Sequence, residues 1–207
     1  MRSKLFLAIL GILAVVASGF IPPVLAQPVL AQAAPSTVSA TQAGTTLALG
    51  KLEVAMSQAD PETKEFGMAA NDYWKLIVAN NDGPRVYNFF RALTAERKTP
   101  NATLLAQRAS AACYYLAWLA QANLMEGFGQ SQGSQIGEQA HADFETALKL
   151  DPENFSALYG YAIYEGYRPG GQAHQKELLA RLDALRASRP YYPWHLVDTL
   201  EKTGKPE

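Results

Sequence analysis

Residues 140–162, with the sequence AHADFETALKLDPENFSALYGYA, predict two helices joined by a tight corner. Four apolar residues recur at the spacing that places them on one helix face: Ala140, Phe144, Ala147 and Leu148. Asp151 and Pro152 then mark the corner, because proline breaks a helix interior and an aspartate side chain accepts hydrogen bonds from the first N–H groups of a helix. The stretch therefore predicts a helical hairpin with Asp151 capping its second helix.

Helical spacing also dominates the rest of the chain, and no segment alternates apolar and polar residues as a half-buried strand does. We expect helices over residues 46–58, 60–79, 102–124, 172–188 and 194–202, and a further one that begins at Pro84. Asp60 and Thr99, each followed by a proline, are expected to cap the helices after them. The glycine-rich residues 127–137 are expected to form a flexible loop. Together these patterns predict an all-α domain.

The first residues have the order of a secretory signal peptide. Arg2 and Lys4 precede an apolar run over residues 5–16, and small or helix-breaking residues follow. Cleavage after Ala26 and cleavage after Ala31 both fit, so we expect a signal peptide within residues 1–31. The alternative is an uncleaved membrane anchor, although Gly19 and the prolines after it shorten any helix below about 20 residues.

Composition then limits the remainder of the chain. Residues 32–44 are small and polar and are expected to form a flexible leader, which leaves residues 45–207 for the folded domain. The 18 Lys and Arg residues against 19 Asp and Glu residues give a net charge of -1, so no electrostatic argument favours nucleic acid as a partner. A membrane is expected as a partner only through the signal segment, if that segment stays uncleaved.

Four residues of the opening stretch carry a resemblance to a known family. Ala140, Phe144, Ala147 and Pro152 keep the spacing of the second helix of a tetratricopeptide repeat and the proline after it, and Ala162 matches the small position of the next unit. The chain thus resembles a divergent tetratricopeptide repeat protein. The resemblance implies antiparallel helical hairpins stacked as a short, irregular solenoid, clearest over residues 111–190. The glycine-rich loop stands where one helix of the repeat is expected.

Candidate catalytic and metal-binding residues are few. Cys113 is the single cysteine, which excludes an intramolecular disulfide, and its alanine-rich surroundings favour a buried thiol over a nucleophile. Glu138, His141 and Glu145 share a helix face that in principle suits a divalent cation, but a solvated polar face is the favoured interpretation. We expect no catalytic residue, no metal and no cofactor. Asn101 and Asn154 stand in glycosylation triplets near helix starts, where we expect them to cap helices.

Aromatic residues crowd two of the expected helices. If the geometry of the repeat family holds, the first helix of each unit lines a concave groove, which implies six partner-binding residues: Tyr114, Trp118, Gln121, Tyr159, Ile163 and Tyr167. Tyrosine and tryptophan suit this role because they bury a large area at little rotamer cost. Burial of the aromatic residues in the core is an equally weighted alternative.

These features together predict a function class. We expect an exported, non-enzymatic protein–protein interaction module that acts as an adaptor or scaffold of a bacterial cell envelope, in the periplasm or secreted. Its partner is expected to be a protein or a peptide. Two alternatives stay open: a self-assembling structural or accessory subunit, and an enzyme or small-ligand binder with a pocket near His141. The oligomeric state stays open as well.

Overall fold

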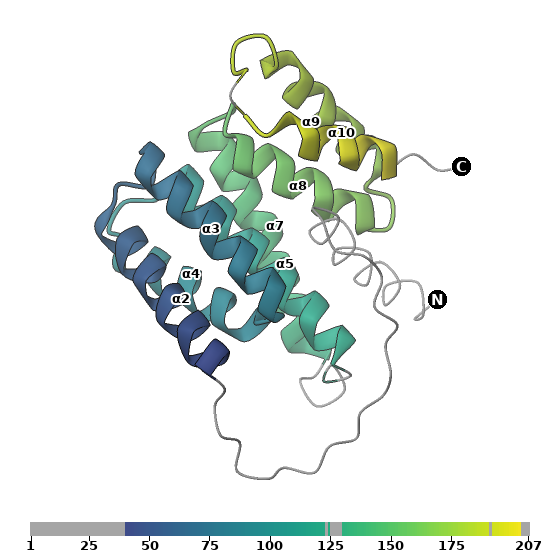
Figure 1. Ribbon diagram of the computed structural model, residues 1–207. Coiled ribbons are helices and arrows are strands. Elements are labelled where there is room, and N and C mark those ends of the chain that lie inside the picture. Colours follow the sequence, from purple (N-terminus) through teal and green to yellow (C-terminus); the bar gives the residue numbers. More distant parts are fainter. Residues whose placement is uncertain (1–39, 123, 125–129, 191, 204–207) are drawn as a thin grey trace. The chain divides into compact units, whose positions relative to one another are not determined.

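The structure is a computed structural model that describes residues 40–122, 124, 130–190 and 192–203 (Figure 1). These residues form helices and no strand, which confirms the all-α class. The helices are α2 (Ala40–Gln58), α3 (Lys64–Asn80), α4 (Gly83–Glu96), α5 (Ala102–Gln121), α7 (Gln130–Leu150), α8 (Phe155–Tyr167), α9 (Gln172–Leu185) and α10 (Trp194–Thr203). The expected signal peptide, residues 1–31, lies outside the described residues.

The chain divides into two compact units, and one of them contains α2 and α3. Across this hairpin the Tyr73 hydroxyl donates to Glu53 Oε1 at 2.9 Å. The α2 helix begins at Ala40, so residues 40–44 are helical. The expected flexible leader over residues 32–44 is therefore wrong for residues 40–44. The α3 helix begins at Lys64 because the Thr63 hydroxyl accepts from the N–H of Phe66. Asp60 lies in the turn before this helix, where its side chain accepts from the N–H of Glu62.

The other unit contains α4 to α10, and α5 is its central helix. It packs against α4, α7 and α8 (Figure 1). Its alanines let these neighbours approach closely, and most of its residues are buried. Arg108 on α5 donates through Nε and Nη2 to the two carboxylate oxygens of Asp143 on α7, each at 2.6 Å. Asp143 is 3% exposed, so this bidentate pair joins the two helices below the surface.

The α7 helix corrects the expected glycine-rich loop. It begins at Gln130 and runs through Gly133 and Gly137, so residues 130–137 are helical, whereas residues 127–129 of the expected loop lie outside the described residues. Each glycine costs a helix about 1 kcal/mol relative to alanine. Packing of the apolar face offsets that cost, because Ile136 lies against the same hydrophobic cluster as the buried alanines of α5. Tertiary contact therefore overrides the local preference for a turn.

Asparagine and aspartate side chains begin three of the helices. Asp82, Asn101 and Asn154 accept from the N–H three residues further on, at 3.2, 3.0 and 3.0 Å. The capping role expected for the two asparagines is confirmed. The caps expected at Thr99 and Asp151 are wrong: each proline stands before the true cap. Asp151 instead accepts from the N–H of Glu153 within the corner.

The residues that carry the repeat resemblance are mostly buried around one contact. Ala140, Phe144, Ala147 and Ala162 are fully buried, whereas Pro152 is exposed at the corner between α7 and α8. A Cβ atom added to Gly160 of α8 would lie 2.8 Å from Ser110 Oγ and 2.9 Å from Phe144 Cε1. The α8 helix thus approaches α5 and α7 as closely as a missing side chain permits.

The closing helix α10 is held to α9 by packing and by a cluster of charges. Val197 and Leu200 are buried in the cluster that contains Leu178 and Leu182 of α9. Arg186, the residue after the end of α9, donates to Asp183 at 3.0 Å and to Asp198 of α10 at 2.8 Å. Burial raises the pKa of the Glu201 carboxyl, and the nearby carboxylates of Asp183 and Asp198 raise it further, against the opposing effect of Arg186.

We expect Glu201→Gln to raise thermal stability near about pH 8 and to change it little near about pH 4. The folded-state pKa of Glu201 lies above its ordinary 4.5, so the protonated carboxyl stabilises the fold at low pH and this contribution is lost as the pH rises through the raised value. Unfolding temperatures of both proteins across this range test the expectation. Glu177→Gln on the exposed face of α9 is the control. If the difference in unfolding temperature between Glu201→Gln and the wild type stays constant with pH, the expectation is contradicted.

Candidate functional site

The six residues of the expected groove differ in exposure. Tyr114 and Ile163 expose only 3% and 8% of their surface, so they have little to offer a partner. Trp118, Tyr159 and Tyr167 are half-buried, and Gln121 is exposed. The structure therefore leaves four of the six side chains with accessible surface.

The three groove residues on α5 and the three on α8 contact different neighbours. On α5, Trp118 packs so tightly on Gly83 that a Cβ atom there would lie 2.6 Å from Trp118 Cβ, and Gln121 accepts from the Asn81 amide at 3.4 Å. These residues face the start of α4. On α8, the Tyr159 ring stacks on Phe155 at 5.9 Å. Burial raises the pKa of Tyr159 to about 12, with a smaller effect from the neighbouring Tyr167.

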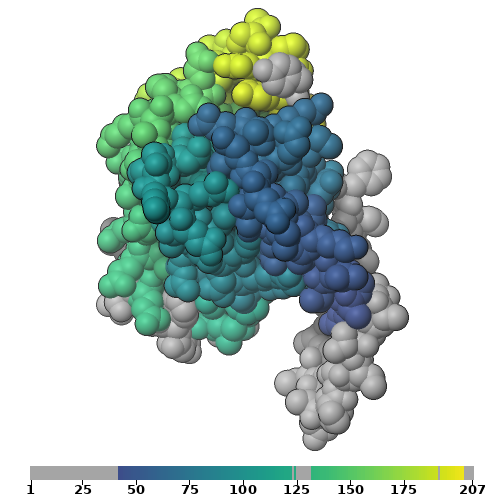
Figure 2. Space-filling view, turned by 90° about the vertical axis from the view of Figure 1, so that its left-hand side faces the viewer, coloured from purple at the N-terminus to yellow at the C-terminus, as the bar shows by residue number. Residues whose placement is uncertain are grey.

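A cavity of about 340 Å³ lies between α4, α5 and α7, and we call it the α4–α7 pocket. Figure 2 shows the teal surface of α5 beside the green surface of α7. The pocket lies wholly within the unit that contains α4 to α10. Its lining consists of Tyr87, Asn88, Arg91, Tyr115, Gln132, Gln135 and Ile136. A volume of this size is at the lower end of the range for ligand sites, about 300–1,000 Å³.

Stacked aromatic rings form one wall of the pocket. Tyr87 and Tyr115 stack with ring centroids 4.8 Å apart and planes 9° apart, and Tyr115 stacks on Trp118 at 6.1 Å. The guanidinium of Arg91 lies 5.6 Å from the Tyr87 ring. Because the stacking occupies ring faces, Tyr87 and Tyr115 offer a ligand mainly their ring edges, and Tyr87 offers its hydroxyl group as well.

Three polar groups of the pocket have no hydrogen-bond partner in the part of the chain that the structure describes. The Tyr87 hydroxyl and the amides of Gln132 and Gln135 make no hydrogen bond there. Arg91 reaches only Asn88 Oδ1, at 3.5 Å, and no described carboxylate lies within ion-pair distance of it. Among the described residues, the pocket thus presents one cation, several amides and no anion.

Sequence reasoning missed this pocket for two reasons. It chose Tyr114 where the structure exposes Tyr115, and one residue turns a helix by about 100°. It also assigned Gln132 and Gln135 to a loop. The available signals were the spacing of Tyr87 and Arg91 at i, i+4 and of the two glutamines at i, i+3.

His141 belongs to a polar network on α7 and α8. Its Nδ1 atom lies 3.1 Å from the Tyr161 hydroxyl and 3.9 Å from Glu145 Oε1. Burial raises the pKa of Tyr161, and the charges of Glu165 and Glu145 raise it further. His141 and Glu145 do not line the α4–α7 pocket. Among the described residues, no group of three His, Cys, Asp or Glu side chains is placed to hold a metal ion.

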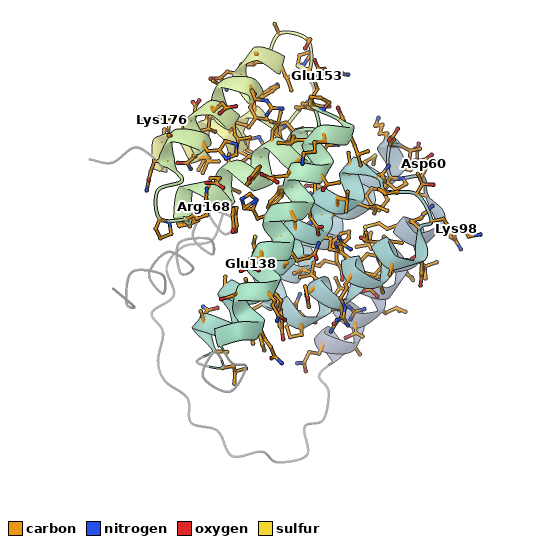
Figure 3. The ribbon with its side chains drawn as sticks, turned by 180° about the vertical axis from the view of Figure 1, so that it is seen from behind. Asp60, Lys98, Glu138, Glu153, Arg168 and Lys176 are labelled. Atoms are coloured by element: carbon orange, nitrogen blue, oxygen red, sulfur yellow. The ribbon has the colours of Figure 1, made fainter. Side chains whose placement is uncertain are left out.

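A buried carboxylate, Glu165, organises the corner between α8 and α9. It is fully buried and accepts from Arg168 Nε at 3.0 and 2.9 Å and from Nη2 at 2.8 Å. His174 Nδ1 lies 3.7 Å from Glu165 Oε1. A Cβ atom on Gly171 would lie 2.2 Å from the Glu165 carbonyl oxygen, so only glycine fits there. Figure 3 labels Arg168 at this corner. Nothing in the sequence pattern indicated Glu165.

Cys113 is buried in α5 as a member of the main hydrophobic cluster. Burial raises the pKa of its thiol to about 12, so the thiolate that a nucleophile requires is scarce near neutral pH. Its position is that of a core residue.

The described helices include none that is both long and apolar enough to cross a membrane. Comparisons with protein-family models, with curated proteins and with solved structures find no match to this chain. Its class is therefore stated from its own geometry: an all-α protein with a polar, aromatic-walled pocket between three helices.

Proposed function

We propose that this chain is an exported, non-enzymatic interaction module that binds a segment of a partner protein in the α4–α7 pocket. The observation that carries the proposal is the set of unpartnered polar groups beside a wall of stacked aromatic rings. Export rests on the order of charged, apolar and small residues in the first 31 positions. We propose further that its hairpins are divergent repeats of the tetratricopeptide type, on the spacing around Phe144.

A polypeptide ligand suits this pocket because the amide side chains of the lining carry both a donor and an acceptor, as a peptide main chain does. Gln132 and Gln135 stand one turn apart on α7, opposite Asn88 on α4. A chain lying between them can bond to both walls. Tyrosine at such a surface adds area at low rotamer cost and retains a hydroxyl for hydrogen bonding.

Self-assembly is a second candidate, favoured by a different observation. Leu47 and Val54 on α2 are 62% and 56% exposed and stand seven residues apart on one helix face. Exposed apolar residues on one face indicate an interface when they are contiguous. The mass of the purified chain in solution separates this candidate from a monomeric adaptor.

The pocket is tested by filling it. Gln135→Trp places an indole at the pocket wall, and we expect it to reduce partner capture at least about tenfold, which corresponds to about 1.4 kcal/mol. The readout is quantitative mass spectrometry of proteins retained from an envelope extract by the full chain. Ala142→Trp is the matched control, because Ala142 is exposed two turns further along the same side of α7.

The outcome that contradicts the proposal is equally definite. If Gln135→Trp retains the same proteins as the wild type, the α4–α7 pocket is not the binding surface. If both tryptophan variants lose capture while their circular dichroism is unchanged, the surface extends along α7 beyond the pocket.

A further inference from the structure

We infer that the α4–α7 pocket selects an acidic side chain within an extended partner segment, with the carboxylate bound by Arg91. This inference rests on the proposed function and narrows it to one chemical class of partner. Arg91 is exposed, lies beside Tyr87 and has no carboxylate partner among the described residues. A cation in a concave site without a neighbouring anion attracts a negatively charged group of a ligand.

The remaining lining explains why the anion is expected on a polypeptide. A carboxylate needs several donors, and Arg91 provides a planar fork that can engage both of its oxygens. The amides of Gln132 and Gln135, across the pocket, are available to the main chain on either side of the acidic residue. The Tyr87 hydroxyl adds a further donor. None of the described residues that line the pocket is a carboxylate.

The geometry disfavours a carbohydrate as occupant. Sugar rings bind aromatic side chains through C–H groups that lie on an exposed ring face. Here Tyr115 stacks on both Tyr87 and Trp118, and the Arg91 guanidinium lies 5.6 Å from the Tyr87 ring. The faces that a sugar requires are therefore used within the protein, whereas the edges that bind a polar chain stay accessible.

The test compares three pools of fluorescent nonapeptides that are blocked at both ends and randomised except at the centre, which is Glu, Gln or Lys. A fourth pool has a Gln centre and a free terminal carboxylate. Binding to the full chain is followed by fluorescence polarisation. We expect the Glu pool to bind about tenfold more tightly than the Gln pool. The preference should weaken with added salt, because Arg91 is exposed.

Two variants connect the preference to Arg91. Arg91→Gln should remove the advantage of Glu over Gln, so that the two pools bind this variant equally. Lys98→Gln removes the same charge just beyond α4 and should preserve the advantage. Figure 3 shows Lys98 well to one side of α7, where Glu138 is labelled. Both residues are exposed, so both variants are expected to fold.

The outcomes distinguish the acidic preference from the proposed peptide site itself. Equal binding of the Glu and Gln pools, lost in Gln135→Trp, overturns the acidic preference but keeps the pocket as a peptide site. Preference for the free terminal carboxylate assigns Arg91 to a chain end and overturns an internal acidic residue. A Glu advantage that survives in Arg91→Gln also overturns the inference. Binding of no pool above the level of Gln135→Trp overturns the inference and the proposed function together.

Discussion

Phe144→Ala is expected to reduce the free energy of unfolding by about 3–5 kcal/mol. Phe144 is fully buried and stacks on Tyr161 with ring centroids 5.2 Å apart. Removal of its ring leaves a cavity against Gly160, which has no side chain of its own to fill it. Urea unfolding followed by circular dichroism measures the loss.

The control for this prediction is Phe89→Ala on α4, since Phe89 is only partly buried. We expect it to cost clearly less than Phe144→Ala. Phe144→Leu should fall between alanine and the wild type because it retains part of the volume. A loss below about 1 kcal/mol for Phe144→Ala would show that α7, α8 and α5 repack around the site, contrary to the close approach at Gly160.

Arg168→Met is expected to reduce the free energy of unfolding by about 3 kcal/mol. It removes every donor that Arg168 supplies to Glu165 and leaves a fully buried carboxylate with the His174 imidazole 3.7 Å away. The cost is placed at the lower end of the range for broken buried pairs because the Arg168 side chain is itself 43% exposed. Thermal and urea unfolding of the variant provide the measurement.

A second substitution identifies the cause of that loss. Glu165→Gln removes the buried charge, so the double variant with Arg168→Met should recover part of the stability that the single variant loses. Arg181→Met provides a comparison, because Arg181 donates to the Pro152 carbonyl in an exposed contact at 2.8 Å. If the double variant is as unstable as Arg168→Met alone, the packing of the arginine stem matters more than the buried charge.

Local patterns predicted the helices well because helix formation depends on residues three and four positions apart. Leu178, Leu182 and Leu185 are buried as their spacing predicted. The ends of helices were predicted less well. At both Pro100 and Pro152 the sequence suggested a cap before the proline, yet Asn101 and Asn154 begin the helices. Several residues near each end can cap, and the choice depends on how the helix packs.

The candidate site was harder to predict than the fold because it is assembled from three helices distant in sequence. The aromatic crowding on α5 pointed to the correct helix, but its neighbours Tyr87 and Gln135 come from segments 28 residues before and 20 residues after Tyr115. Pattern reasoning addresses one helix at a time and cannot identify which faces meet.

The sequence by itself determined the all-α class, most helices and the burial of Ala140, Phe144 and Ala147, because apolar periodicity is a local property of the chain. Tertiary structure alone decided that residues 130–137 are helical, that Tyr115 and not Tyr114 is accessible, and that Glu165 is buried against Arg168. These outcomes depend on packing energies between distant segments, which outweigh local preferences of about 1 kcal/mol.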